Sequence, residues 1–285
     1  MSVLPDEDYQ HSFGLKAGSA EKFFAPTARR AELLAERRHW LRNDTARCAA
    51  LLPGAEPLLE ETIALAREWN SLPDGDGRAA LRAASSVHSD SPSLAQRGPT
   101  DLADCLALGE AWEPDYLLLK RDATTQRFHL LGGCVCFPSS WRFEEKVGQP
   151  LEVIHTPVPH LNEQLVSPIH NFLSRLKPGV AWCRANWGLS RSPELNQHPA
   201  RGLPKLRPPL RADEVWLRVE DQALVALPQS GGVLFGIRIA LHRLDELARD
   251  PDARAGLRRA LVSMPAEMAA YKRIDAVREA VVGLL

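Results

Sequence analysis

The sequence predicts an α+β protein in which an antiparallel sheet is flanked by helices. Two stretches, residues 116–138 and 215–244, contain paired apolar runs around a polar or glycine-rich turn, the pattern of antiparallel hairpins. Short helical segments interrupted by prolines lie between them, and longer amphipathic helices come before and after. Strands next to short, broken helices are typical of an α+β domain with a pocket.

The composition indicates a globular protein without an obvious charged partner. The chain has 285 residues, of which 45% are hydrophobic and 25% charged, so it can bury one substantial core or two smaller ones. The formal net charge of −1 disfavours a nucleic-acid or anionic membrane partner. The beginning "MSVLPDEDYQHSFGLK" lacks the basic start and apolar run of a signal peptide. We therefore expect no membrane span and a cytoplasmic location.

The five cysteines do not suggest a disulfide framework. Their number is odd and they are scattered along the chain, which is typical of small buried hydrophobic residues in a reducing compartment. Cys134 and Cys136 would face the same side of a strand, but no second Cys or His pair stands at zinc-site spacing. A metal role for this pair is therefore only a minor alternative.

The first hundred residues are expected to be mainly helical. Leucine and tryptophan recur near helical spacing across residues 27–52 and again across 57–72, which predicts two amphipathic helices. Residues 73–100 are rich in Gly, Ser, Asp and Pro and predict a mobile connection. We therefore assign residues 1–100 to an N-terminal helical region and mobile connection.

The middle of the chain combines the first hairpin with short helices. Within residues 116–138, Gly132 and Gly133 indicate a bulge or the close approach of another group. The segment "EEKVGQPLEVIHTP" predicts a short helix, a break, and a second helical turn that ends at Pro157. Residues 162–176 then predict a further amphipathic helix.

The second hairpin predicts a sheet with one polar row. Alternation places Val215, Leu217 and Val219 on one face of the strand. The other face has the polar row Trp216, Arg218, Glu220 and Gln222. On the following strand, Arg238 shares a side with Leu234, Gly236, Ala240 and His242, opposite a core-like row. Helices are expected at residues 245–264 and 265–285. We therefore expect a core at 101–245 and C-terminal helices at 246–285.

Three stretches carry a family resemblance, and they are "LLGGCVCFPSSWRFEEKVGQPLEVIHTPVPHLNEQL", "CRANWGL" and "LRVEDQALVALPQSGGVLFGIRIALHRL". In this order they resemble the heme-dependent oxidative N-demethylases, relatives of the dimethylamine monooxygenase heme subunit. The resemblance covers roughly residues 115–245, with weaker support from the N-terminal "FGLK"; "SDSPSLAQRGPT" matches no motif of the family. It implies a PAS-like heme domain, in which short helices face the heme across an antiparallel sheet.

With this resemblance, His155 is the first candidate for the axial iron ligand. A heme iron needs one strong donor in a fixed orientation, and a neutral imidazole on a short helix, held by Pro157 and Pro159, supplies one. His160 and His170 compete with it, and a thiolate from Cys134 or Cys136 is a further alternative. The purely structural interpretation is a histidine that caps its helix or bonds a backbone carbonyl.

Several polar and aromatic residues are candidates for the remainder of the heme site. A guanidinium can pair with a heme propionate and an indole can cover the macrocycle edge, which suits Trp141 and Arg142 to the rim. Asn186 is a candidate for orienting bound oxygen or water, and the further cofactor-binding candidates are Arg184, Arg218 and Arg238. The alternative is structural: a tryptophan in the core, arginines in solvent and an asparagine cap.

Glu220 is the candidate for binding a cationic substrate. A secondary or tertiary amine is protonated at neutral pH, and a cation that enters a heme pocket needs a carboxylate or an aromatic face to offset lost hydration. The Glu220 carboxylate meets this need if its strand face lines the pocket. The alternative is an ordinary solvated sheet surface.

The resemblance implies oxidative removal of an N-methyl group with O2, followed by carbinolamine collapse to formaldehyde and the demethylated amine. The sequence has no dinucleotide-binding glycine motif, P-loop or C-x-x-C cluster, so electrons are expected from a separate flavin or ferredoxin-type reductase. Without a C-x-x-C-H attachment sequence, the expected cofactor is noncovalent heme b. The rivals are a PAS-like heme sensor, disfavoured because no transmitter segment is recognised, and a heme-free structural subunit of an oxygenase.

Overall fold

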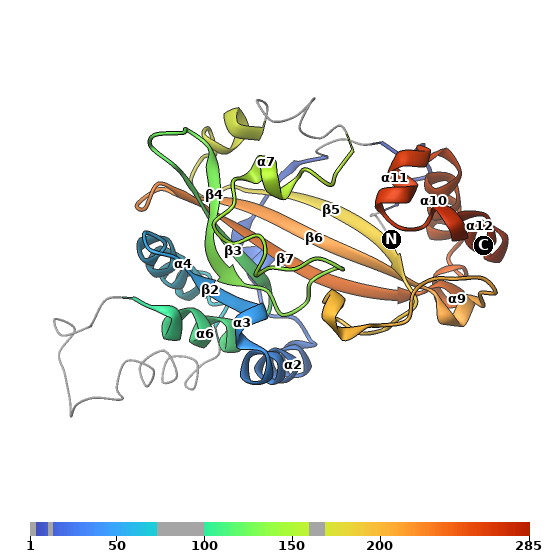
Figure 1. The fold of residues 1–285 in the computed structure, drawn as a ribbon, viewed down its shortest axis with the longest axis horizontal. Helices are drawn as coiled ribbons and strands as arrows, with labels where there is room; N and C mark the ends of the chain where they lie inside the picture. Colours follow the sequence, from blue (N-terminus) through green and yellow to red (C-terminus); the bar gives the residue numbers. More distant parts are fainter. Residues whose placement is uncertain (1–3, 11–13, 73–99, 160–168) are drawn as a thin grey trace.

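The computed structural model describes residues 4–10, 14–72, 100–159 and 169–285 (Figure 1). The described residues form one seven-stranded sheet with the order β1-β5-β6-β7-β3-β4-β2, and every pairing is antiparallel. The strands are β1 (Lys16–Gly18), β2 (Ala49–Leu51), β3 (Asp115–Arg121), β4 (Phe128–Cys134), β5 (Ala181–Ser190), β6 (Trp216–Leu227) and β7 (Gly232–Arg243). Together with the helices around it, this sheet confirms the predicted α+β class.

The helices come from both ends of the chain and from one short central turn. They are α1 (Ala20–Phe24), α2 (Arg30–Asn43), α3 (Thr45–Cys48), α4 (Glu56–Glu68), α6 (Leu102–Ala111), α7 (Leu151–Ile154), α9 (Leu244–Leu247), α10 (Pro251–Ser263), α11 (Ala266–Tyr271) and α12 (Arg278–Leu284). Residues 169–173 are also helical, at the end of the helix expected over 162–176, whose beginning lies outside the described residues. Within the described ranges, no helix is long and apolar enough to cross a bilayer.

Both predicted hairpins are present, as β3–β4 and β6–β7. The glycine pair has the predicted role: the register shifts between Leu118 and Leu119, opposite this part of β4. A Cβ atom on Gly133 would lie 2.2 Å from the Tyr116 carbonyl oxygen, and one on Gly132 would lie 2.7 Å from that of Ala50. Glycine is therefore needed where three backbones approach closely.

The expected helical region before residue 100 also supplies two strands to the sheet. The helix predicted across residues 27–52 ends earlier, because Ala49–Leu51 form β2 and pair with β4. Strand β1 pairs with β5 at the other edge. The sheet therefore crosses the boundary expected at residue 100.

The structure adds one strand that the sequence analysis did not assign, and it corrects the expected C-terminal helices. The polar and aromatic stretch "CRANWGL" belongs to β5, which no alternation in the sequence indicated and which pairs with β6 along its whole length. The C-terminal helices are also more broken than expected. Asp250 caps a new helix that begins at Pro251, and Arg273, with φ of +57°, ends the helical turn after α11.

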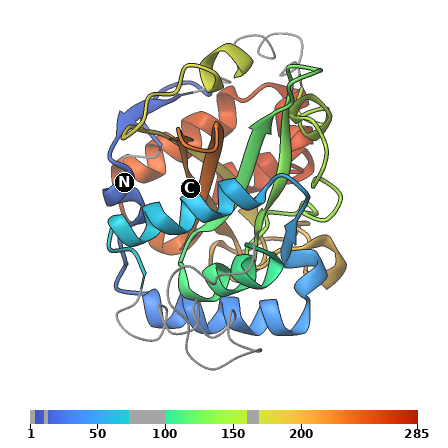
Figure 2. The same ribbon diagram turned by 90° about the vertical axis from the view of Figure 1, so that its left-hand side faces the viewer.

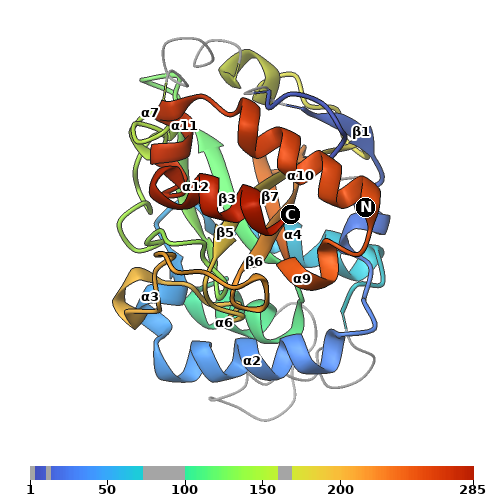
Figure 3. The same ribbon diagram turned by 90° about the vertical axis from the view of Figure 1, so that its right-hand side faces the viewer.

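The two sheet faces are covered by different parts of the chain. Helices α2, α4 and α6 lie on one side of β3 and β4, and α7 lies on the other (Figures 1 and 2). The C-terminal helices gather at one end of the sheet (Figure 3). Three apolar clusters correspond to these layers, represented by Leu58, Leu108 and Leu234; by Leu217, Leu257 and Val281; and by Leu117, Leu130 and Val233.

Candidate functional site

A row of polar side chains from β5 and β6 lies on the sheet face that α7 covers. In the antiparallel register Arg184 is opposite Gln222, and Asn186 is opposite Glu220. Directly opposed residues in a sheet project from the same face, so these four side chains are neighbours. On the next strand, Glu220 is opposite Ile239. The polar row therefore borders an apolar part of the same face.

Glu220 is anchored through only one of its carboxylate oxygens. Gln222 Nε2 donates to Glu220 Oε2 at 2.9 Å, and Asn186 Nδ2 lies 3.4 Å from the same oxygen. Among the described residues, no hydrogen bond reaches Glu220 Oε1. Since a carboxylate has about four acceptor positions, the anchored group keeps acceptor capacity for a ligand.

His155 lies at the end of α7 with a fixed backbone and an unused imidazole. Its backbone N–H donates to the Leu151 carbonyl at 2.9 Å, and Pro157 follows two residues later. Within the described part of the chain, its ring makes no hydrogen bond. Burial, and to a smaller extent the charge of Arg184, lower the pKa of His155 to about 4. The imidazole is therefore neutral near pH 7 and can donate a lone pair.

Arg184 is the third group with unused polar capacity. Its guanidinium makes no hydrogen bond or ion pair with any described residue. Burial lowers the pKa of Arg184, while the charge of Glu220 raises it. The register of β5 and β6 places Arg184 diagonally beside Glu220, and the effect of its charge on the His155 pKa indicates that the end of α7 lies near it. His155, Arg184 and Glu220 therefore lie on one sheet face, each with polar capacity that no described residue uses.

The C-terminal helices add Lys272, which the sequence interpretation missed. Its ammonium donates to Asn186 Oδ1 at 3.1 Å and to the Trp187 carbonyl at 2.5 Å, and it lies 5.2 Å from the centre of the Trp187 ring. Burial, partly opposed by the charge of Glu220, lowers the pKa of Lys272 to about 8. Because β1 pairs only with residues 181–183 of β5, the Trp187 carbonyl lies beyond that pairing and can accept from Lys272.

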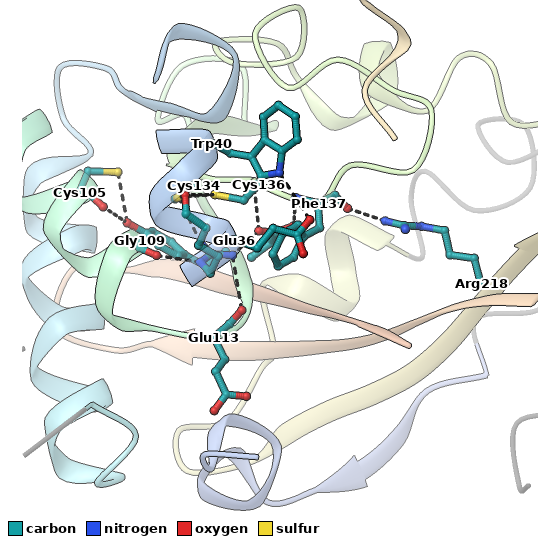
Figure 4. A network of polar contacts seen from close by, with 12 residues as sticks. Glu36, Trp40, Cys105, Gly109, Glu113, Cys134, Cys136, Phe137 and Arg218 are labelled. Carbon is teal, nitrogen blue, oxygen red and sulfur yellow. Dashed lines mark hydrogen bonds and ion pairs between the residues drawn. The ribbon is translucent and has the colours of Figure 1, made fainter. Parts of the chain in front are cut away.

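Arg218 does not join the group, although it is on the same strand face as Glu220. It is 3% exposed, and its guanidinium donates to Ser139 Oγ at 2.5 Å and to the Phe137 carbonyl at 2.6 Å. Figure 4 shows this reach from β6 to Phe137. The side chain therefore fixes the loop after β4, and these contacts occupy much of its hydrogen-bonding capacity.

Arg238 lies on the opposite sheet face. In the register of β6 and β7 it is opposite Asp221, which alternates with Glu220. Its guanidinium donates to the carbonyls of Phe23 and Ala25, both at 2.7 Å, and to Glu113 Oε2 at 3.0 Å. It fastens the C-terminal end of α1 to the sheet, and the structure does not bring it near His155.

The proposed rim residues Trp141 and Arg142 are divided between core and solvent. Trp141 is half-buried and packs against the apolar cluster of the α7 face. Arg142 is exposed, and its guanidinium pairs with Glu145 at 2.6 Å. Only Trp141 therefore contacts the layer that contains α7.

The competing histidines have different positions. His160 lies outside the described residues. His170 Nε2 lies 2.9 Å from Glu152 Oε1, its Nδ1 is buried without a partner, and its ring centre lies 5.8 Å from that of Phe128. His170 thus stays the rival ligand, but it already has a carboxylate partner that His155 lacks.

Cys134 and Cys136 lie in a dense polar network in the core. Their sulfur atoms are 3.8 Å apart (Figure 4). Arg37 Nη2 lies 3.2 Å from Cys134 Sγ. Burial raises the pKa of Cys136 well above its usual range, and the contact with Cys136 and burial raise that of Cys134. Both belong to the cluster with Leu58 and Leu108, so they are protonated thiols away from the α7 face. No three His, Cys, Asp or Glu side chains in the described ranges form a metal-binding group.

A cavity of about 390 Å³ opens beside β5 on the same face as Arg184. Its lining residues are Asn171, Phe172, Arg175, Lys177, Val180 and Trp182. The rings of Phe172 and Trp182 meet edge to face, with centres 5.4 Å apart. Aromatic walls with a few polar groups are typical of a cofactor or ligand site.

One family model matches nearly the whole chain. It is described as "haem-dependent oxidative N-demethylase, alpha subunit-like", and it matches residues 21–282. The match includes β5, the polar row on β6, and Lys272 at the end of α11.

Proposed function

The chain belongs to the haem-dependent oxidative N-demethylase, alpha subunit-like family, and we propose that it demethylates a small amine at a heme on the α7 face of the sheet. The observation that carries this proposal is that His155, Arg184 and Glu220 lie on one sheet face, with Arg184 beside Glu220 and its charge acting on His155. Each has polar capacity that no described residue uses. A cofactor with a metal and carboxylates, together with a cationic substrate, would satisfy all three.

The residues present fit a b-type heme. The neutral imidazole of His155 would ligate the iron, and the guanidinium of Arg184 would pair with a propionate, since a planar fork of donors suits a carboxylate. Phe172, Trp182 and Ile239 offer apolar surface to a macrocycle. The PAS-like character of the domain is part of the same proposal. It is supported by the short helix α7, which covers one face of an antiparallel sheet.

When bound, the heme would supply the iron at which O2 is reduced with electrons from a separate flavin or ferredoxin-type partner. Glu220 would bind the substrate ammonium through Oε1, while Gln222 and Asn186 hold Oε2 and prevent the carboxylate from turning away. In this role Asn186 positions Glu220. In the collapse of the carbinolamine product the C–N bond would break and the hydroxyl proton would pass to nitrogen, which releases formaldehyde and the demethylated amine.

We predict that Glu220→Gln weakens binding of a methylated amine with little change in heme content. The substitution keeps the shape and removes the charge, so the expected loss is roughly 1–3 kcal/mol, or about 5- to 150-fold in affinity. Because Lys272 and Arg184 already lie near Glu220, we expect the lower half of this range. The measurement is a titration of the heme spectrum with dimethylamine at matched pH and salt.

The matched control is Glu145→Gln, which removes an exposed carboxylate paired with Arg142 and should leave the titration unchanged. Equal affinities for Glu220→Gln and the unmodified protein would place Glu220 outside the substrate site. If no methylated amine changes the spectrum of the unmodified protein or yields formaldehyde, the heme-sensor alternative is favoured instead.

A further inference from the structure

The substrate ammonium would meet a site that already contains a cation and an anion, which one amide side chain links. Lys272 and Glu220 are joined through one side chain, because the Lys272 ammonium donates to Asn186 Oδ1 at 3.1 Å and Asn186 Nδ2 faces Glu220 Oε2 at 3.4 Å. An ammonium can only donate hydrogen bonds and a carboxylate can only accept them. The Asn186 amide therefore accepts from Lys272 through its oxygen and donates to Glu220 through its nitrogen. The amide of Asn186 therefore holds a fixed cation and a fixed anion at a set spacing.

With respect to the described residues, Lys272 keeps one free hydrogen-bond donor, and Glu220 keeps one free acceptor oxygen. Lys272 has three N–H donors, and described residues accept two of them, at Asn186 and Trp187. Glu220 keeps Oε1, which no described residue contacts by a hydrogen bond. A ligand that reaches both would therefore find an acceptor for its ammonium and, a short distance away, a donor for an anionic group.

We propose that the site selects a zwitterionic substrate, an N-methylated amino acid, in preference to a simple methylated amine. This inference rests on the proposed function. A lone ammonium ion adds a positive charge to a half-buried site that already contains Lys272, and removing it from water is not fully compensated. A zwitterion brings its own counter-charge. Its ammonium binds Glu220 and its carboxylate binds Lys272.

The Lys272 ammonium and the Glu220 carboxylate contact the two ends of the same side-chain amide, so they lie close together. A ligand that bridges them therefore needs its amine and carboxylate close together, as they are in an α-amino acid. The guanidinium of Arg184 remains available for a heme propionate. Lys272 is thus the specificity-determining residue, through the charge that it presents to the second end of the substrate.

The test compares sarcosine with dimethylamine, because sarcosine is dimethylamine with a carboxylate on one methyl group. Binding is measured by isothermal titration calorimetry on the heme-loaded full chain, so that a ligand is detected even if the heme spectrum does not change. We expect sarcosine to bind at least about tenfold more tightly than dimethylamine. In Lys272→Met the affinity for sarcosine should fall by about tenfold or more, while that for dimethylamine stays equal or rises.

Two further variants complete the test. Lys205→Met changes an exposed lysine in the loop before β6 and should leave both affinities unchanged, whereas Lys272→Arg should retain most of the preference for sarcosine. Equal binding of the two ligands to the unmodified protein, or an equal loss of both in Lys272→Met, would overturn the inference while amine demethylation stands. If neither ligand binds although heme is present, the inference and the amine-demethylase proposal both fail.

Discussion

The variant His155→Ala is expected to lose most of its bound heme, or to hold it with altered ligation and a shifted absorption spectrum. No other described side chain on the α7 face combines an unpartnered imidazole with proximity to Arg184 and Glu220. In the proposed site the His155 imidazole would hold the iron, so the alanine variant would leave the heme without that ligand. Added imidazole should restore part of the original spectrum, because a free ligand can enter the space that the side chain leaves.

His170→Ala is the matched control, because it removes the rival imidazole from the same layer. We expect this variant to keep its heme with the original spectrum, since the His170 ring already contacts Glu152. Heme content is measured by extraction and by the pyridine complex of the iron. An unchanged spectrum in His155→Ala, together with heme loss in the His170 or His160 variant, would move the ligand assignment to that residue.

Arg37→Met is expected to destabilise the folded protein strongly. Arg37 is fully buried in α2, and it donates to the Gly109 carbonyl at 2.7 Å and to Asp115 Oδ1 at 2.5 Å. The Asp115 carboxylate also accepts the backbone N–H groups of Cys136 and Phe137. Methionine would leave this carboxylate without its counter-charge, a loss of about 3–5 kcal/mol in the free energy of unfolding.

Arg42→Met on the same helix provides the comparison. Its guanidinium is 71% exposed and lies 3.9 Å from Glu110, so its loss should cost less than about 1 kcal/mol. Chemical denaturation of the two variants under identical conditions gives the difference. A similar free energy of unfolding for both would mean that the buried network does not hold α2 against the loop after β4.

The strands of the two hairpins could be predicted because their signals are local. Alternation and a polar turn identify β3–β4 and β6–β7, and the glycine pair in β4 marks a close approach of backbones. The same alternation correctly placed Glu220 and Gln222 on one face. These features depend on the period of a strand and on neighbours within the same hairpin.

The use of each arginine could not be predicted, because it depends on distant backbone. Arg218 and Arg184 share a sheet face, yet Arg218 is bound to the carbonyl of Phe137 whereas Arg184 has no partner among the described residues. Arg238 lies on the other face and holds the C-terminal end of α1. Periodicity assigns a residue to a face, but it does not say which carbonyls will be folded against that face.

Lys272 and β5 were missed for related reasons. Strand β5 mixes aromatic, polar and small residues, so its sequence shows no alternation. It forms a strand because it pairs with β6. Lys272 reaches the site only because the C-terminal helices fold back over the end of the sheet, more than eighty residues after Asn186 in the chain. No local signal in the sequence contains that contact.

The most direct test of the central claim is the absorption spectrum of the full chain, purified from cells with adequate heme supply and then titrated with hemin. The proposed site predicts a Soret band whose intensity at saturation corresponds to about one heme per chain. Acid-acetone should extract the pigment, since the sequence has no C-x-x-C-H attachment motif. A colourless protein that does not take up hemin would contradict the account, because the free polar groups of His155, Arg184 and Glu220 would then not belong to a heme site.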